Sequence, residues 1–183
     1  MFCWLLTPCA PRLFSFLLSF FLSFFLSILL CFVRFKVDDA DLRYGVTGAI
    51  WKAAEDAENR YLLQDLKALE QLCPLLTGQK DDVLVNVAGC ICELANSAKA
   101  RKSVRSAGGL EALIKHLSST NDALLVNVTR AVASACQDND SMSVIEKGDG
   151  VRLLWSLLKS SNSEVVANSA SALCPCLQYA KDR

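Results

Sequence analysis

Apolar side chains recur with helical spacing from about residue 41 to the end of the chain. Three sets of four apolar residues have the i, i+3, i+4, i+7 spacing that places side chains on one face of an α-helix. The sets are Leu69, Leu72, Cys73 and Leu76; Leu110, Leu113, Ile114 and Leu117; and Val151, Leu154, Trp155 and Leu158. Each set begins 41 positions after the one before it. The sequence therefore predicts three amphipathic helices in a regular array.

The 41-residue period includes polar positions as well. The tetrapeptide LVNV occurs at residues 84–87 and again at 125–128, and asparagine recurs at Asn86, Asn127 and Asn168. A fixed period of this length is typical of stacked helical repeats. The repeat therefore has to be considered before any single motif in it.

A longer helix is predicted after the polar turn that ends each amphipathic helix. Its N-cap candidates in the three units are Asp81, Asp122 and Ser163. In residues 81–94 apolar side chains cover most of the helix circumference, so this helix needs neighbours on several sides. Each long helix carries one narrow stripe of mostly polar or small residues. The stripes are Asp41, Gly45, Gly48 and Lys52; Asp82, Asn86, Gly89 and Glu93; Ala123, Asn127, Arg130 and Ser134; and Glu164, Asn168, Ser171 and Pro175.

A third, shorter helical segment leads into each amphipathic helix, at residues 99–104 and 140–145. Glycine pairs follow these segments and are expected to make the sharp turn, because glycine accepts positive φ angles. The pairs are Gly108 with Gly109, and Gly148 with Gly150. Three helices per 41 residues predict an all-α fold, an α-solenoid of about three and a half repeats with a groove.

The repeats divide the chain into five segments. We expect a hydrophobic segment at 1–36, the end of a partial repeat at 41–63, repeats at 64–104 and 105–145, and a truncated repeat at 146–183. The truncated repeat is expected to expose Val165, Leu173 and Leu177 where another repeat would stack. Proline 175 lies inside a predicted helix and is expected to bend it.

Stacking places the polar stripes side by side along the groove, where a protein partner would lie. The candidate partner-binding residues are Asp82, Asn86, Glu93, Asn127, Arg130, Ser134, Glu164, Asn168 and Ser171. For the three asparagines the favoured interpretation is a hydrogen bond to a neighbouring turn of the solenoid rather than direct contact with a partner.

The first part of the chain has a different composition. Residues 13–33 contain no charged side chain and would form about 31 Å of helix, which is long enough to cross a bilayer. A membrane anchor is one interpretation. The other is translated intron sequence from a mis-predicted exon, because almost all of these residues can have codons that begin with a pyrimidine. Both interpretations stay open.

Charge and cysteine content narrow the function classes. The chain has 19 Lys and Arg and 19 Asp and Glu, so its net charge favours neither nucleic acid nor an anionic membrane surface. Six of its nine cysteines lie within apolar helical patterns, and we expect reduced, buried thiols in a cytoplasmic protein. The six are Cys73, Cys90, Cys92, Cys136, Cys174 and Cys176. Their spacing predicts no zinc site.

No catalytic constellation is found in the sequence. The chain has one histidine, His116, on the polar side of an amphipathic helix, and a solvated surface residue is the favoured interpretation. No glycine-rich phosphate loop follows a strand, and no metal-ligand spacing occurs. We therefore expect no enzyme, no cofactor, no bound metal and no small-molecule substrate.

The combination of a short helix, a glycine turn, an amphipathic helix and a long buried helix resembles the armadillo repeat. The stretch SAGGLEALIKHLSSTNDALLVNVTRAV is similar to that pattern almost throughout, and the resemblance extends over about residues 41–183. It implies an armadillo-type α-solenoid, preceded here by a separate hydrophobic N-terminal helix. Armadillo proteins are scaffolds that bind other proteins.

Several segments resemble more specifically the armadillo-repeat subunits of outer dynein arm docking complexes in motile cilia. They are YGVTGAIWK, DDVLVNVAG, NDALLVNVTRAV, DGVRLLWSLLK and ALCPC. The resemblance implies a scaffold of the cytoplasm and ciliary axoneme that contributes to cilium movement. Its expected partners are coiled-coil docking subunits, dynein arm components or microtubule-associated components.

Two other functions are considered. A membrane-anchored armadillo adaptor requires residues 13–33 to be a genuine anchor. A peptide-carrying transport or signalling adaptor would resemble the armadillo proteins that clamp an extended peptide with Trp and Asn side chains. Here the Trp positions hold Gly89, Arg130 and Ser171, and the Asn positions hold Glu93, Ser134 and Pro175. These differences argue against the same mode of peptide binding.

Overall fold

The protein is described by a computed structural model over residues 39–181. The hydrophobic segment 1–36, with its predicted helix, lies outside the described residues. Within residues 39–181 every regular element is helical, as the sequence predicts. The elements are α2 (Ala40–Ala54), α3 (Ala57–Asp65), α4 (Ala68–Leu72), the 3₁₀ helix η1 (Cys73–Leu76), α5 (Asp81–Leu94), α6 (Ala98–Ser106), α7 (Gly109–His116), α8 (Asp122–Ala135), α9 (Asn139–Lys147), α10 (Gly150–Leu157) and α11 (Ser163–Lys181).

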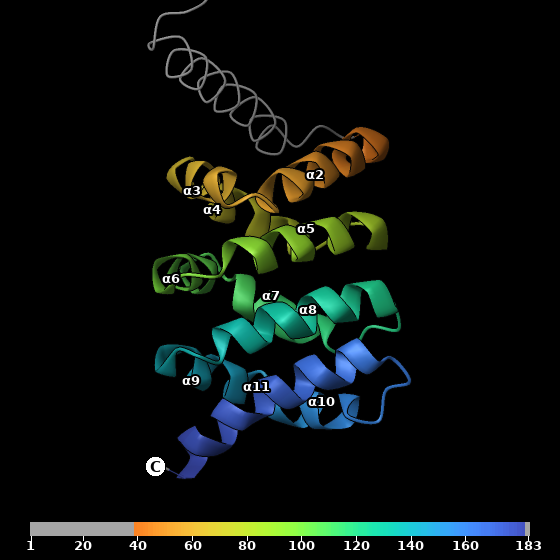
Figure 1. Ribbon diagram of the computed structural model, residues 1–183. Coiled ribbons are helices and arrows are strands. Elements are labelled where there is room, and N and C mark those ends of the chain that lie inside the picture. Colours follow the sequence, from red (N-terminus) through yellow and green to blue (C-terminus); the bar gives the residue numbers. More distant parts are fainter. Residues whose placement is uncertain (1–38, 182–183) are drawn as a thin grey trace, which may run out of the picture.

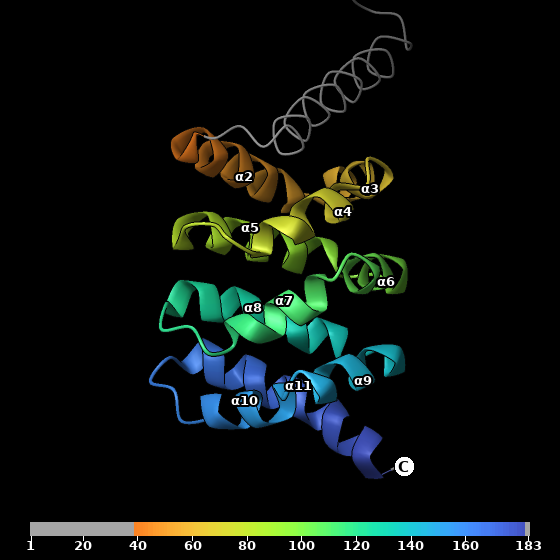
Figure 2. The ribbon, with the colours of Figure 1, turned by 180° about the vertical axis from the view of Figure 1, so that it is seen from behind.

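The helices stack in layers, each with a short, an amphipathic and a long helix. The complete layers are α3–α4–η1–α5, α6–α7–α8 and α9–α10–α11, and α2 is the long helix that stacks above α5. Figure 1 shows the long helices α2, α5, α8 and α11 side by side, and Figure 2 shows α4, α7 and α10 on the other side of the stack. This arrangement confirms the all-helical armadillo-like solenoid.

The helix layers have the predicted period but a different phase. The predicted repeat boundaries at residues 64, 105 and 146 fall inside α3, α6 and α9. If the layers are instead taken to begin at Ala57, Ala98 and Asn139, no layer boundary falls inside a helix.

Long-helix caps lie one residue earlier than predicted. Asn121 Oδ1 accepts a hydrogen bond from the Leu124 N–H at 3.1 Å, and Asn162 Oδ1 accepts one from the Glu164 N–H at 3.0 Å. The predicted caps Asp81, Asp122 and Ser163 are instead the first helical residues. A carboxylate in the first turn still favours the helix through its dipole, which is why the two positions look alike in sequence.

Burial follows the amphipathic pattern through the middle of the stack. Leu69 and Leu110 are 2% and 1% exposed, because α4 packs against α5 and α6, and α7 packs against η1, α8 and α9. In the last layer the expectation for Val165 and Leu173 is wrong: both are buried, since α11 packs on both α8 and α10. Leu177 is exposed as expected, and Trp155 on α10 is also exposed.

The two prolines within predicted helices behave differently. Pro74 lies in η1, and α4 ends before it at Leu72, as expected from the missing N–H. Helix α11 continues through Pro175 from Ser163 to Lys181 without interruption.

The turn before each amphipathic helix uses one left-handed residue, and this position also has the 41-residue period. It is occupied by Lys67 with φ 55°, Gly108 with φ 71° and Asp149 with φ 59°. Gly148, which was expected to take the positive angle, has φ −83°. The left-handed conformation is therefore a property of the repeat position, whichever residue occupies it.

Exchanging residues at this position should change stability in opposite directions. A side chain in the left-handed region costs about 1–2 kcal/mol, partly offset by the greater entropy that glycine loses on folding. Lys67→Gly should therefore raise the free energy of unfolding by about 0.5 kcal/mol, and Gly108→Ala should lower it by about 1 kcal/mol. No atom lies within 4 Å of a Cβ built on Gly108, so its cost is one of backbone conformation. Urea unfolding followed by circular dichroism measures both changes, and a lower midpoint for Lys67→Gly would contradict the assignment.

Candidate functional site

The predicted groove residues lie on the surface formed by α2, α5, α8 and α11, which we call the ladder face (Figure 1). These four helices pack directly on one another in chain order. The side chains of the predicted polar stripes are therefore carried by consecutive, neighbouring helices.

Three asparagines join the long helices. Asn86 Nδ2 donates a hydrogen bond to the Tyr44 carbonyl oxygen at 3.1 Å, and Asn86 Nδ2 also lies 3.3 Å from Thr47 Oγ1. Asn127 Nδ2 donates to the carbonyl oxygen of Val85 at 3.1 Å.

The third layer repeats the contact. Asn168 Nδ2 donates to the Val126 carbonyl oxygen at 3.3 Å. Each bond joins residues 42 positions apart, and we call the three bonds the asparagine ladder. The favoured interpretation of the three asparagines, a bond within the solenoid, is confirmed. Asn86 and Asn127 are buried and Asn168 is half-buried.

A charged cluster lies near the middle of the ladder face. Arg130 Nη2 donates to Glu93 Oε1 at 2.8 Å, and Arg130 Nε donates to Cys92 Sγ at 2.8 Å. Arg60 of α3 lies 3.6 Å from the other carboxylate oxygen of Glu93. Ser134 Oγ donates to the Ala95 carbonyl oxygen at 2.9 Å. The carboxylate of Glu93 therefore interacts with two guanidinium groups from two different layers.

The ring of Trp51 occupies the surface of α5 at Gly89. A Cβ added to Gly89 would lie 2.4 Å from Cε2 of Trp51, far inside van der Waals contact. The indole of α2 therefore rests directly on the α5 backbone, and only glycine leaves room for it. Peptide-clamping armadillo proteins have a tryptophan at the position of Gly89. In this chain the indole at that place is the side chain of Trp51, from the neighbouring helix α2.

The structure brings some predicted site residues together and separates others. Glu93 and Arg130 form an ion pair, whereas no ion pair is present for Asp82 or Glu164 among residues 39–181. Asp82, Arg130, Glu164 and Ser171 are exposed, and Glu93 and Ser134 are half-buried. The functional candidates that the sequence did not single out are Trp51, Arg60 and Cys92. The spacing of 38 residues that joins Trp51 to Gly89 also joins Cys92 to Arg130, and it is the signal that would have found Trp51 and Cys92.

A second charged cluster joins α6 to α9 at the edge of the stack. Arg101 makes two hydrogen bonds of 3.0 Å to the carboxylate of Asp138, one from Nε and one from Nη2. Arg105 donates to Asp140 Oδ2 and to Ser141 Oγ, each at 3.0 Å. The side chains of Arg101 and Asp138 are only 11% and 20% exposed, so this pair belongs to the packing between layers.

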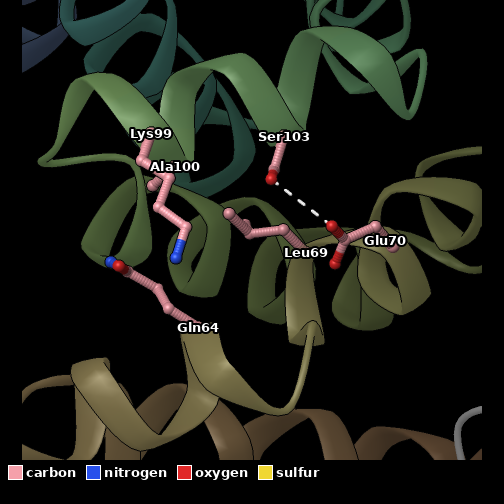
Figure 3. A pocket seen from close by; sticks show the side chains of 6 residues that line it. All are labelled: Gln64, Leu69, Glu70, Lys99, Ala100 and Ser103. Carbon is pink, nitrogen blue, oxygen red and sulfur yellow. Dashed lines mark hydrogen bonds between the residues drawn. The ribbon is translucent and has the colours of Figure 1, made fainter.

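Several cavities lie along the same edge, and one of them, a hollow of about 340 Å³ between α9 and α11, also reaches Pro175 of the α11 stripe. One small cavity of about 20 Å³ lies between α3, α4 and α6, where Ser103 Oγ donates to Glu70 Oε1 at 3.3 Å (Figure 3). It has room for about one water molecule. Larger open hollows of about 310 and 430 Å³ lie beside α3 and α6, lined by equivalent positions of successive layers, such as Tyr61 and Lys102.

The six described cysteines and His116 are placed as structural rather than catalytic groups. Burial raises the pKa of the Cys73 thiol to about 12 and also raises that of Cys90. Cys174 is exposed, contrary to the expectation of six buried thiols. A ring nitrogen of His116, Nε2, lies 2.6 Å from the Leu76 carbonyl oxygen, so the histidine joins two layers instead of being solvated. Within residues 39–181, no group of His, Cys, Asp and Glu side chains has a metal-binding arrangement.

The predicted membrane anchor at residues 13–33 is not described by the structure. Among the residues that are described, no helix is long and apolar enough to cross a membrane.

Comparison with known proteins identifies the repeat. Residues 56–96 match the sequence profile of the armadillo/β-catenin-like repeat, and they coincide with the layer of α3, α4, η1 and α5. The described residues form an armadillo-like α-solenoid. Among curated proteins, none matches the chain at a significant level.

Similarity to solved structures extends over most of the chain. Two engineered proteins are 25% and 26% identical, with TM-scores of 0.76 and 0.77, and the match covers 84% and 86% of this chain. A designed armadillo repeat protein is 24% identical over 82% of this chain, with a TM-score of 0.75. The chain spans 63%, 39% and 64% of the length of these three proteins.

The asparagine ladder can be tested by an isosteric change. Asn127→Asp replaces the donor Nδ2 by an oxygen that faces the Val85 carbonyl, in a site that is 5% exposed. We expect the free energy of unfolding to fall by about 2–4 kcal/mol at neutral pH. The loss in free energy of unfolding should become smaller as the pH is lowered. Burial raises the pKa of the new carboxyl in the folded state, so the folded protein binds a proton at a higher pH than the unfolded protein and is stabilised by it. Urea unfolding at neutral and at acidic pH measures the loss of stability. Asn96→Asp, at an exposed position, is the control. Equal losses in the two variants would contradict the asparagine ladder.

Thiol reactivity should follow burial. The thiolate is the reactive form, so burial protects Cys73 and Cys90 both sterically and by raising their pKa. In the folded protein we expect iodoacetamide to alkylate Cys174 at least tenfold faster than Cys73 or Cys90. Peptide mass spectrometry measures the rates, and the difference should disappear in urea. Rapid labelling of Cys90 in the folded protein would show that α5 is not packed as described.

Proposed function

We propose that this chain is a non-enzymatic scaffold that binds a partner protein along the ladder face. The observation that carries the proposal is the asparagine ladder. It fixes α5, α8 and α11 in one register, so an exposed position such as that of Asp82 recurs at Ala123 and Glu164 on successive helices at a set spacing. A surface with this regularity is suited to an elongated partner segment that contacts several layers in turn.

Protein binding by this fold has a precedent. A designed armadillo repeat protein, 21% identical with a TM-score of 0.74, was solved in complex with the peptide (KR)4. The chemistry of recognition in the present chain is different from that of a Trp and Asn clamp, because the clamp positions hold Gly89 and Glu93 in the first complete layer and Arg130 and Ser134 in the next.

The specific function that we propose is docking of outer dynein arms on ciliary axonemal microtubules, and thereby a part in cilium movement. The support comes from the segments that resemble armadillo-repeat docking subunits, among them DDVLVNVAG on α5 and NDALLVNVTRAV on α8. Both segments contribute to the ladder face. The proposed partners are coiled-coil docking subunits, dynein arm components or microtubule-associated components, and the proposed location is the cytoplasm and the axoneme.

A second candidate function rests on the uncharged stretch at residues 13–33. If this stretch is an anchor, the armadillo layers would present the ladder face from a membrane surface. The two functions differ in the cell fraction that contains the protein, so fractionation separates them.

The test is the distribution of the tagged chain in multiciliated cells. We expect the protein in the detergent-insoluble axonemal fraction. The variant Asp82→Arg/Ser171→Tyr changes two exposed side chains of the ladder face without breaking a described ion pair, and its axonemal fraction should fall at least fivefold. Lys102→Glu, on exposed α6 surface away from the ladder face, is the control and should not change the distribution.

The contrary outcomes are distinct. A carbonate-resistant membrane pellet would support the anchored adaptor in place of dynein-arm docking. Undiminished axonemal binding by Asp82→Arg/Ser171→Tyr would place the partner on another surface of the solenoid.

A further inference from the structure

Three sulfur atoms from three helices meet between the last two layers. Cys136 Sγ, at the end of α8, lies 3.8 Å from Cys176 Sγ of α11. Met142 Sδ, from α9, lies 3.9 Å from Cys176 Sγ. All three residues are buried. The two thiols are therefore held side by side by the packing of the layers, although they are 40 positions apart in the sequence.

The facing cysteines are specific to this junction between layers. A shift of 41 residues moves Cys136 and Cys176 onto Ala95 and Ala135, which are also buried, at the ends of α5 and α8. Alanine therefore fills both positions at the junction above, whereas both are cysteine here. A small apolar side chain is enough for packing at this place, so packing alone does not require two thiols.

A hollow beside the two thiols gives small solutes a way to reach them. It lies between α9 and α11, has a volume of about 340 Å³ and is lined in part by Cys136, Met142 and Pro175. One water molecule takes up about 30 Å³ of liquid volume, so a hydroperoxide fits easily in a hollow of this size. The buried pair is therefore close to solvent on one side.

The hydrogen bond between the thiols favours one of them as the nucleophile. When Cys136 donates, it stabilises the Cys176 thiolate and lowers the pKa of Cys176, although burial and the nearby Glu146 act in the opposite direction. The same hydrogen bond, together with burial, raises the pKa of Cys136. The thiolate is the form of cysteine that reacts with peroxides. Cys176 is therefore the first sulfur to react, and Cys136 is the resolving thiol.

We propose that Cys136 and Cys176 form an oxidation site for hydroperoxides, at which the pair is converted to a disulfide that links α8 to α11. The Cys176 sulfur attacks one oxygen of hydrogen peroxide. An S–O bond forms, the O–O bond breaks, and the leaving hydroxide takes the proton released by the Cys176 thiol. The Cys136 sulfur then attacks the Cys176 sulfur, the S–O bond breaks, and a second water leaves with the Cys136 proton. Two thiols are oxidised to one disulfide, and one peroxide is reduced to two water molecules.

The disulfide should stabilise the last two layers. The sulfur atoms have to approach from 3.8 Å to about 2.05 Å, which rotation of the two side chains brings about. The bond closes a loop of about 40 residues and so restricts the unfolded chain. We therefore expect hydrogen peroxide to raise the melting temperature by about 5–10 °C, and a thiol reductant to reverse the change.

The test treats the full chain with hydrogen peroxide, blocks the remaining thiols and maps disulfides by peptide mass spectrometry without reduction. Every sample carries Cys174→Ser, because Cys174 is exposed and lies two residues from Cys176. Trypsin cleaves between Cys136 and Cys176, at Lys147 and Lys159, so the disulfide joins two separate peptides. We expect the joined peptides to increase at least tenfold on oxidation and to separate on reduction.

The matched variants are Cys136→Ala and Cys176→Ala, which introduce the residue that the junction above has at both positions. Circular dichroism before oxidation should show that both variants fold as the parent chain does. Peroxide should then leave their melting temperatures within about 1 °C, because neither variant can form the disulfide. In Cys136→Ala the reaction should stop at the sulfenic acid of Cys176, and dimedone added together with urea should label it. Cys73 and Cys90 are the buried reference thiols and should stay reduced.

Three outcomes would overturn the inference. The first is the absence of joined peptides after oxidation, and the second is an equal rise in melting temperature for the parent chain and the alanine variants. The third is oxidation of Met142 to its sulfoxide while both thiols stay reduced. The oxidation site does not involve partner binding on the ladder face, so none of these outcomes affects the proposed scaffold function.

Discussion

The structure depends on the fact that no long helix of this solenoid can bury its own surface. Ala88 and Cys90 are two residues apart and point to nearly opposite sides of α5, and both are fully buried. Such a helix is stable only between α2 and α8, and the same holds for α8 between α5 and α11. Apolar packing alone would allow neighbouring helices to slide. The asparagine ladder prevents this, because a buried amide must find its hydrogen-bond partner at one register.

Once the register is fixed, side chains on facing helices have to fit one another in size. Trp51 rests on Gly89, where even a methyl group would overlap the ring. One layer further on, Cys92 occupies the place of Trp51 and leaves space for the guanidinium of Arg130. The chemistry of the ladder face is therefore set pairwise by neighbouring layers. This pairing gives a physical reason for the missing tryptophan at position 89, since the space is already filled from α2.

The period in the sequence predicted the all-helical solenoid, the side-by-side stripes and the bonding role of the asparagines, because all three follow from one repeated spacing. The exact residue at which each long helix begins was harder to predict. Asn121 and Asp122 both suit the start of a helix, and only the hydrogen bond to Leu124 distinguishes cap from first turn. The burial of Val165 and Leu173 was missed because periodicity shows that a helix has an apolar face but not which neighbour covers it. Arg60 was missed for a related reason: its reach from α3 to Glu93 crosses between elements and has no counterpart in a stripe on a single helix.

The two charged clusters show how stability and binding are separated in this fold. Arg101 and Asp138 are nearly buried and make two parallel hydrogen bonds between α6 and α9, so removing Asp138 would leave the charge of Arg101 unpaired inside the stack. Arg130 is 45% exposed and Glu93 is 25% exposed, so their pair on the ladder face is expected to contribute less to folding than the α6–α9 cluster. The layers are thus joined mainly by the apolar core, the asparagine ladder and the α6–α9 cluster. Because Arg130 is more exposed than Arg101, we expect a substitution of Arg130 to disturb the fold less than a substitution of Arg101.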